Sequence, residues 1–187
     1  MKTPLLALAL VATVAASASA QTSGPAAGQP ATIAPLYVPI FGVTAGIALP
    51  VGRVADDHAA GYALGGLVEY AVAGQPYALR GELLFQHFAL KSGRTTGSDE
   101  NLTSLGATLV FKTLQAPNTV TTANTFATAG IAVYHGTDLG TRPGANVGAG
   151  IEIPLTGFSA TGEARVHLML ADGRPVITLP LTVGIRF

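Results

Sequence analysis

The stretch Val176–Phe187, VITLPLTVGIRF, decides the fold class of this chain. Apolar residues occupy every second position from Ile177 to Phe187, and Thr, Pro, Gly and Arg stand between them. Alternation with a period of two is the pattern of a β-strand whose two faces meet different surroundings. The stretch therefore predicts a strand, and similar alternating runs precede it along most of the chain.

The pattern appears in eight runs, separated by segments rich in Gly, Asn, Asp, Thr and Pro. No stretch of this region keeps an apolar face at helical period, so the sequence predicts an all-β chain. Most runs are near the ~9–11 residues that a tilted strand needs to cross a bilayer. The predicted strands cover residues 41–50, 61–72, 77–90, 102–114, 125–135, 145–154, 158–170 and 176–187.

The connections between these strands differ in length. Segments 51–60, 91–101 and 136–144 are long and charged, whereas 73–76 and 155–157 are tight. Long loops on one side and short turns on the other are typical of outer-membrane barrels. We therefore expect a closed eight-stranded antiparallel up-and-down transmembrane β-barrel over residues 41–187. Two connections do not fit, because 115–124 is long on the short-turn side and 171–175 is short on the other.

The first forty residues predict export. Residues 1–20 combine a basic residue, an apolar segment and the small-residue cleavage pattern Ala18-Ser19-Ala20, which indicates a signal peptide. The apolar segment is shorter than the ~20 residues that a membrane-spanning helix requires. Residues 21–40 contain four prolines and no charge, and predict a disordered Pro-rich leader.

Composition limits the classes of function. Charged residues make up only 11% of the 187 residues, against 49% hydrophobic ones, and the charged share is well below that of a soluble domain. The ten basic and ten acidic residues cancel, so no basic patch points to a nucleic-acid partner. The absence of cysteine excludes disulfide and thiol chemistry.

Charged residues inside the predicted strands all lie on the phase opposite the apolar residues. A basic side chain that faces lipid at mid-membrane costs ~2–4 kcal/mol, so these charges are expected to face the lumen. The tight turn at 73–76 places Glu69 opposite Arg80. We expect a lumenal ion-pair network made of Glu69, Arg80, Glu82, Glu152, Glu163 and Arg165. The alternative is that these side chains are separate and solvated by water. Other charges, Glu100 and Arg142 among them, are expected in the outer loops.

Aromatic residues gather at strand ends on the short-turn side. Those that share the apolar phase are Phe41, Tyr70, Tyr77, Phe111, Phe158 and Phe187, whereas Phe126 lies on the other phase. An aromatic girdle at one membrane interface accounts for this clustering.

These features resemble the small eight-stranded outer-membrane β-barrels of the OmpA/OmpX and opacity-porin type. The residues that carry the resemblance are the signal peptide, the alternating runs, the inward charges and the final LTVGIRF. The resemblance implies that Leu181, Val183, Ile185 and Phe187 form the signal read by the barrel-assembly machinery. It also implies a monomer in contact with outer-membrane lipid and lipopolysaccharide. Pro180 departs from the pattern, since proline removes a hydrogen bond from the sheet. The peptidoglycan-binding domain of the larger OmpA proteins is not expected after residue 187.

Some barrels of this kind are enzymes acting on lipid A, which directs attention to histidine. His87 and His135 fall on the lipid-facing phase near the outer strand ends, but the His-x-Ser pairing of the lipid deacylases is missing. His58 and His167 are assigned to a solvated loop and to the lumen. Neither a cofactor nor a metal site is expected, although Asp99 and Glu100 are adjacent acids in an outer loop.

Three functions remain open at this point. The first is a non-enzymatic outer-membrane barrel with a structural or surface-interaction role, and its lumen is filled by side chains because eight strands enclose little space. The second is a lipid A-modifying enzyme. The third is a secreted soluble barrel that binds a small ligand, which requires the apolar phase to face inward.

Overall fold

The computed structural model describes residues 39–71, 75–92, 97–113, 123–171 and 175–187. The expected signal peptide and nearly all of the expected leader lie outside these residues. The described elements are β1 (Pro39–Val51), α2 (Arg53–Asp57), β2 (Gly61–Ala71), β3 (Tyr77–Phe88), β4 (Glu100–Lys112), β5 (Asn124–Gly136), β6 (Gly140–Leu155), β7 (Phe158–Met169) and β8 (Val176–Arg186).

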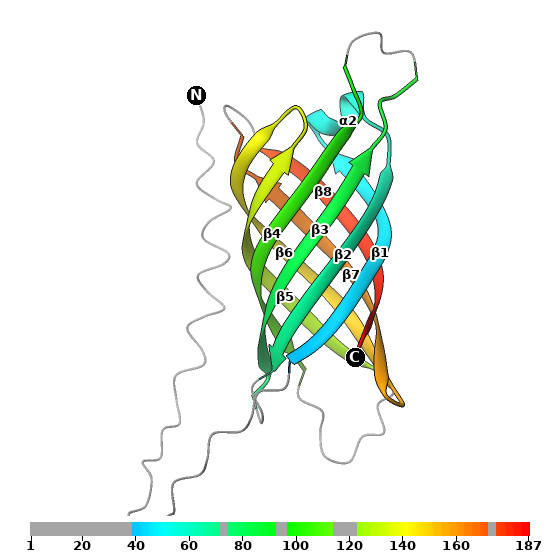
Figure 1. The fold of residues 1–187 in the computed structure, drawn as a ribbon, viewed down its shortest axis with the longest axis vertical. Coiled ribbons are helices and arrows are strands. Elements are labelled where there is room, and N and C mark those ends of the chain that lie inside the picture. Colours follow the sequence, from blue (N-terminus) through cyan, green and yellow to red (C-terminus); the bar gives the residue numbers. More distant parts are fainter. Residues whose placement is uncertain (1–38, 72–74, 93–96, 114–122, 172–174) are drawn as a thin grey trace, which may run out of the picture. The chain divides into compact units, whose positions relative to one another are not determined.

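The eight strands form one closed antiparallel barrel in which each strand pairs with its neighbours in sequence. Figure 1 shows the strands inclined to the barrel axis, with α2 at one end and the carboxyl terminus near the other. Pairing of β1 with β8 closes the sheet, and Phe41 and Phe187 exchange backbone hydrogen bonds of 2.9 Å. The predicted fold, a closed up-and-down barrel, is confirmed. Among the described residues no helix has the length and apolar character needed to cross a bilayer.

Four strands, β1, β4, β5 and β6, begin earlier than the sequence suggests. Pro39 and Ile40, assigned to the leader, pair with β2 and belong to β1. The start of β6 lies at Gly140, because the β5–β6 ladder continues to Gly136 opposite Gly140. Pro143 and Gly144 read as loop residues, yet Pro143 faces outward near the strand end. The expected long connection 136–144 is therefore a turn at residues 137–139, and Arg142 lies in a strand instead of a loop.

The two faces of the barrel wall have opposite polarity. Large apolar side chains are exposed on the outward phase of every strand, as with Val43, Leu83, Leu105, Ile131 and Val183. All eight charged residues of the predicted strands lie on the inward phase. This is the reverse of a soluble barrel, which encloses its apolar face. The burial pattern therefore argues against the soluble ligand-binding barrel.

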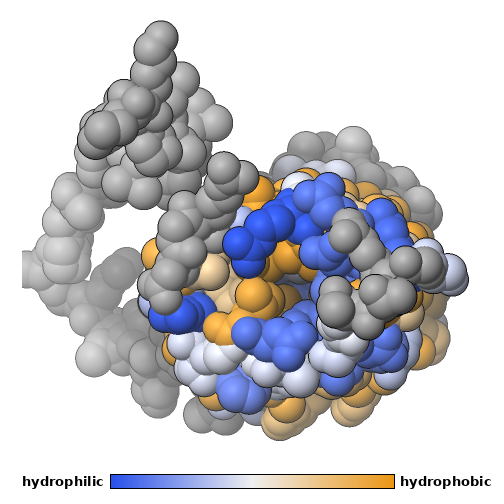
Figure 2. All heavy atoms as spheres, turned by 90° about the horizontal axis from the view of Figure 1, so that it is seen from above, coloured by the Kyte–Doolittle hydropathy of each residue, from blue (hydrophilic) through white to orange (hydrophobic). Residues whose placement is uncertain are grey.

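The interior is packed with side chains. An apolar cluster fills the end near α2, and Val54 of α2 and Leu139 of the β5–β6 turn pack against it. Its buried members are Ala48, Ala63, Leu84, Phe88, Leu102, Ala132, Tyr134, Met169 and Val176. Figure 2, seen from that end, shows hydrophobic residues in the middle of the opening and hydrophilic ones around them. A smaller cluster of Ala78, Val110 and Phe126 lies toward the opposite end.

Candidate functional site

Arg80 occupies the centre of a charged layer inside the barrel. It comes from β3, and its Nη2 lies 3.1 Å from Glu69 Oε2 on the neighbouring strand β2. Its Nη1 lies 2.9 Å from Glu163 Oε2 on β7, across the lumen. The side chains of Arg80 and Glu69 are fully buried. The register places Glu69 opposite Arg80, where the turn symmetry predicts it.

Arg165 extends this layer from β7 back to β3. Its Nη1 lies 2.6 Å from Glu82 Oε1, and its Nη2 lies 2.6 Å from Glu163 Oε1. Glu163 therefore bridges Arg80 and Arg165. The Thr128 hydroxyl donates a further hydrogen bond of 3.1 Å to Glu163 Oε1. Carboxylates held by arginine and a hydroxyl in this way have most of their acceptor capacity filled.

Two cations that the expected network did not include join it near the Phe187 end. Lys112 Nζ lies 2.8 Å from Glu69 Oε1 and 3.4 Å from Glu152 Oε2. Arg186 Nη1 lies 3.4 Å from Glu69 Oε2 and 3.5 Å from Glu152 Oε2. Glu152 has no ion pair with the other five expected members, and it enters the layer only through these two cations. In the sequence, Lys112 and Arg186 lie on the inward phase of their strands, and this position is the signal that could have added them to the expected network.

The complete layer is balanced in charge. It contains four carboxylates and four cations, namely Glu69, Glu82, Glu152 and Glu163 with Arg80, Lys112, Arg165 and Arg186. The Phe126 ring lies 5.5 Å from the Arg80 guanidinium carbon and 5.1 Å from that of Arg186. Cations at these distances are attracted to the face of an aromatic ring. The inward phase of Phe126 is explained by these contacts.

A neutral polar layer lies between the charges and the apolar cluster at the α2 end. The Tyr134 hydroxyl lies 3.1 Å from His167 Nδ1, and the two rings meet edge to face. The Thr108 hydroxyl donates to Asn146 Oδ1 at 3.4 Å. His167 is therefore a lumenal residue, and Tyr134 joins it on the inward phase of β5.

The connections at the α2 end are tied to one another. His58 Nε2, next to α2, lies 3.2 Å from the Ser98 carbonyl oxygen, and the Ser98 hydroxyl donates to Asp138 Oδ2 at 3.0 Å. These bonds link the segments before β2, before β4 and between β5 and β6. Glu100, expected in a loop, is instead buried as the first residue of β4, and its Oε2 accepts the Asp138 amide. It points inward, whereas Asp99 accepts the Leu90 amide at the surface, so the two acids do not share a site.

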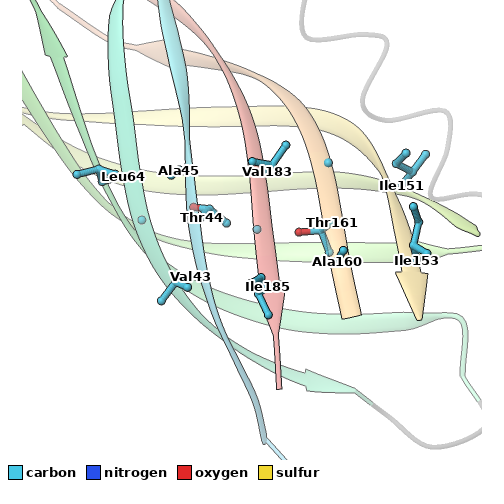
Figure 3. Close-up of a pocket in the computed structure, with 13 residues that line it drawn as sticks. Val43, Thr44, Ala45, Leu64, Ile151, Ile153, Ala160, Thr161, Val183 and Ile185 are labelled. Atoms are coloured by element: carbon cyan, nitrogen blue, oxygen red, sulfur yellow. The ribbon is translucent and has the colours of Figure 1, made fainter. Parts of the chain in front are cut away.

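The residues of the expected girdle all lie exposed near one end of the barrel. They are Phe41, Tyr70, Tyr77, Phe111, Phe158 and Phe187. Figure 3 shows a shallow pocket in the neighbouring part of the wall, lined by β1, β2, β6, β7 and β8. Small side chains such as Ala45 and Ala160 stand there between the larger Ile151, Ile153, Val183 and Ile185. Two residues of the expected assembly signal, Val183 and Ile185, belong to this surface.

The outward histidines lie at the opposite rim. His87 Nδ1 lies 2.9 Å from Asn101 Oδ1, and its ring packs against Tyr62 with centroids 5.1 Å apart. His135 Nδ1 lies 2.8 Å from the Thr141 hydroxyl, its cross-strand neighbour, and both side chains are exposed. Within the described part of the chain no group of three or more metal-binding side chains could hold an ion.

Solved structures of known proteins superpose on this barrel. The structure of Neisserial surface protein A superposes with a TM-score of 0.64 at 16% identity, covering 79% of this chain and 95% of that protein. The outer membrane protein OprG from Pseudomonas aeruginosa gives 0.51 at 11% identity, covering 83% and 99%. The outer membrane enzyme PagL gives 0.50 at 13% identity, covering 80% and 99%.

These likenesses concern the fold. The chain has the fold of the small eight-stranded outer-membrane barrels, as the resemblance in its sequence implies. No family model matches the chain, and no curated protein matches it in sequence.

Proposed function

We propose that this chain is an integral outer-membrane protein with a sealed lumen, acting through the surface formed at its α2 end. The observation that carries the proposal is the inverted wall, in which exposed apolar side chains surround a lumenal layer of eight charged residues. Such an outer surface requires a solvent that accepts apolar groups, and such a lumen requires charges that neutralise one another.

The packed interior supports a structural or surface-interaction role over a diffusion pore. Apolar side chains fill the α2 end, and a neutral polar layer and the ion-pair layer follow below it. An eight-stranded barrel has an interior just wide enough for its side chains. Small solutes therefore have no open path through the described part of the barrel.

The α2 end is the part of the molecule that supports surface interaction. Its connections are held by bonds between segments far apart in sequence, as from Ser98 to Asp138 and from Thr137 to Asn101. Connected loops lose less conformational entropy when a partner binds than loops that move independently. This end lies at the cell surface, and the aromatic girdle lies at the periplasmic interface. The outer face of the barrel is in contact with lipid and lipopolysaccharide.

Biogenesis follows from the same proposal. Residues 1–20 direct export and are then removed, and residues 21–38 are left as a leader before β1. The alternating residues Leu181, Val183, Ile185 and Phe187 are read by the barrel-assembly machinery, and the barrel then stays a monomer. Three of these residues are exposed apolar side chains on the wall, and Phe187 pairs with Phe41 at the closure.

The test is membrane fractionation combined with gel migration of unheated and heated samples. We expect the protein in the outer-membrane fraction, with faster migration before heating because a folded barrel is compact. Reconstitution into planar bilayers should give no steady conductance above that of lipid alone. A soluble periplasmic protein would contradict the membrane assignment, and a stable open conductance would contradict the sealed lumen.

The enzymatic alternative rests on one contact, the His135 imidazole beside the Thr141 hydroxyl. An imidazole next to a hydroxyl is the minimum that nucleophilic catalysis requires, and this one lies at the outer rim. Comparing the lipid A acyl pattern in cells with the wild type, the Thr141→Val variant and no protein tests this alternative. Identical patterns are expected, and a pattern that changes with the wild type alone would establish the enzyme.

A further inference from the structure

Pro180 interrupts the hydrogen-bond ladder between β7 and β8. The register of the two strands is continuous up to Ala164 opposite Leu181 and resumes at His167 opposite Thr178. Between these pairs, Pro180 stands opposite Arg165. The ladder on the other side of β8 is unbroken, with Pro180 paired to Ala48. Because proline has no N–H, β8 offers no donor here, and the Arg165 carbonyl loses the proton that a ladder partner supplies.

A second acceptor lies close to the same point. His167 is two residues further along β7, is buried, and points into the lumen. The Tyr134 hydroxyl lies 3.3 Å from the Ala145 carbonyl oxygen and 3.1 Å from His167 Nδ1, and it has one proton to donate. When that proton goes to Ala145, the hydroxyl accepts from Nδ1, and Nε2 is left as an acceptor. Nε2 has no hydrogen-bond partner among the residues that the structure describes.

Both residues line one small cavity. Its volume is about 10 Å³, and its lining includes Pro180, Arg165, His167, Thr44 and Thr182. This is about the space that a single water molecule requires, and it excludes any larger ligand. Polar residues line most of the cavity, whereas cavities that stay dry are apolar.

We propose that this cavity is a water-binding site built into the barrel wall. One water molecule has two protons, and two acceptors at the site lack a donor, the Arg165 carbonyl and His167 Nε2. The carboxylates of Glu82 and Glu163, which also line the cavity, already accept from Arg165 and Arg80. The hydroxyls of Thr44 and Thr182 supply donors for the oxygen of the water. The water takes the place of the missing N–H of Pro180, so the proline is accommodated and the wall stays closed.

The first test is a crystal structure of the refolded full chain at a resolution that shows ordered water. One water is expected within hydrogen-bond distance of both the Arg165 carbonyl and His167 Nε2. Nitrogen NMR of His167 in lipid nanodiscs should report the neutral ring with its proton on Nδ1. A dry cavity between ordered side chains, or a proton on Nε2, would overturn the proposal.

The second test substitutes Pro180 and one of the two acceptors, His167. Pro180→Ala supplies an N–H that reaches the Arg165 carbonyl directly, so the water should be lost and the amide of residue 180 should exchange slowly with solvent. The matched control is Pro143→Ala, since Pro143 is exposed on β6, and the water should remain. His167→Phe keeps the ladder interruption but removes one acceptor, so the occupancy of the water should fall. An unchanged water in both Pro180→Ala and His167→Phe would contradict the assignment.

Discussion

Arg80 and Glu163 form an ion pair of 2.9 Å across the lumen, although 83 residues separate them in sequence. Their strands, β3 and β7, are not neighbours in the barrel. The contact therefore connects opposite sides of the wall through the interior. It adds a link that backbone hydrogen bonds between adjacent strands do not provide.

Arg80→Ala should strongly destabilise the barrel. It leaves the buried carboxylates of Glu69 and Glu163 without their central cation, and breaking a buried pair costs ~3–5 kcal/mol. Urea unfolding in lipid vesicles measures the free energy of unfolding. The matched control is Arg53→Ala, since Arg53 is exposed on α2 and its loss should change stability by less than ~0.5 kcal/mol. Equal effects of the two substitutions would show that the charged layer does not stabilise the fold.

Ile131→Arg tests which solvent surrounds the wall. Ile131 is 71% exposed near the middle of β5, and an arginine facing lipid at that depth costs ~2–4 kcal/mol. Val51→Arg is the control, because Val51 ends β1 at the rim, where the cost falls to ~0–1 kcal/mol. Urea unfolding in lipid vesicles measures the difference in the free energy of unfolding between the two variants. If both arginines are tolerated equally, the outer face is not in contact with hydrocarbon.

Gly150→Ala should disturb the aromatic contact in the charged layer. A Cβ at Gly150 would stand closer than 3.0 Å to the Phe126 ring and to the Gly162 carbonyl oxygen, and that backbone atom cannot yield easily. Overpacking of this kind costs ~1–3 kcal/mol. A Cβ at Gly66 would lie 4.0 Å from its nearest neighbour, the Gly42 carbonyl oxygen, so Gly66→Ala should be neutral or slightly stabilising. Thermal unfolding gives the midpoint temperature of each variant. A lower midpoint for Gly66→Ala than for Gly150→Ala would contradict the packing around Phe126.

Phe187→Ser separates assembly in the cell from stability of the finished barrel. The Phe187 side chain is 64% exposed, while its backbone pairs with Phe41, and serine keeps that backbone pairing. Refolding into detergent should therefore proceed as in the wild type. The amount in the outer membrane of cells should fall if Phe187 is read by the assembly machinery. A wild-type level in the membrane would remove this residue from the signal.

The sequence was sufficient to predict features that depend on local pattern. Period-two alternation locates the strands, and it assigns Glu82, Glu163 and Arg165 to the inward face. The tight turn at 73–76 fixes the pairing of Glu69 with Arg80, because register follows from the turn in a hairpin. These predictions need only one strand or two consecutive ones.

Features that depend on distant strands could not be predicted in this way. Whether Lys112 reaches Glu69 and Glu152 depends on strand tilt and on the stagger around the whole barrel. The inward position of Glu100 follows from β4 beginning earlier than its apolar residues indicate. The start of β6 at Gly140 differs from the predicted start because Pro143 and Gly144 are typical turn residues, and pairing with β5 overrides this local preference.

The pairing of β1 with β8 constrains the order of events during folding. The pairs that close the barrel, such as Gly42 with Arg186, join the two ends of the domain. Contacts between residues so far apart in sequence form slowly, because the loop between them must first be closed. The cylinder is therefore incomplete until its final strand arrives. A truncated chain has two unpaired strand edges, which are prone to aggregate.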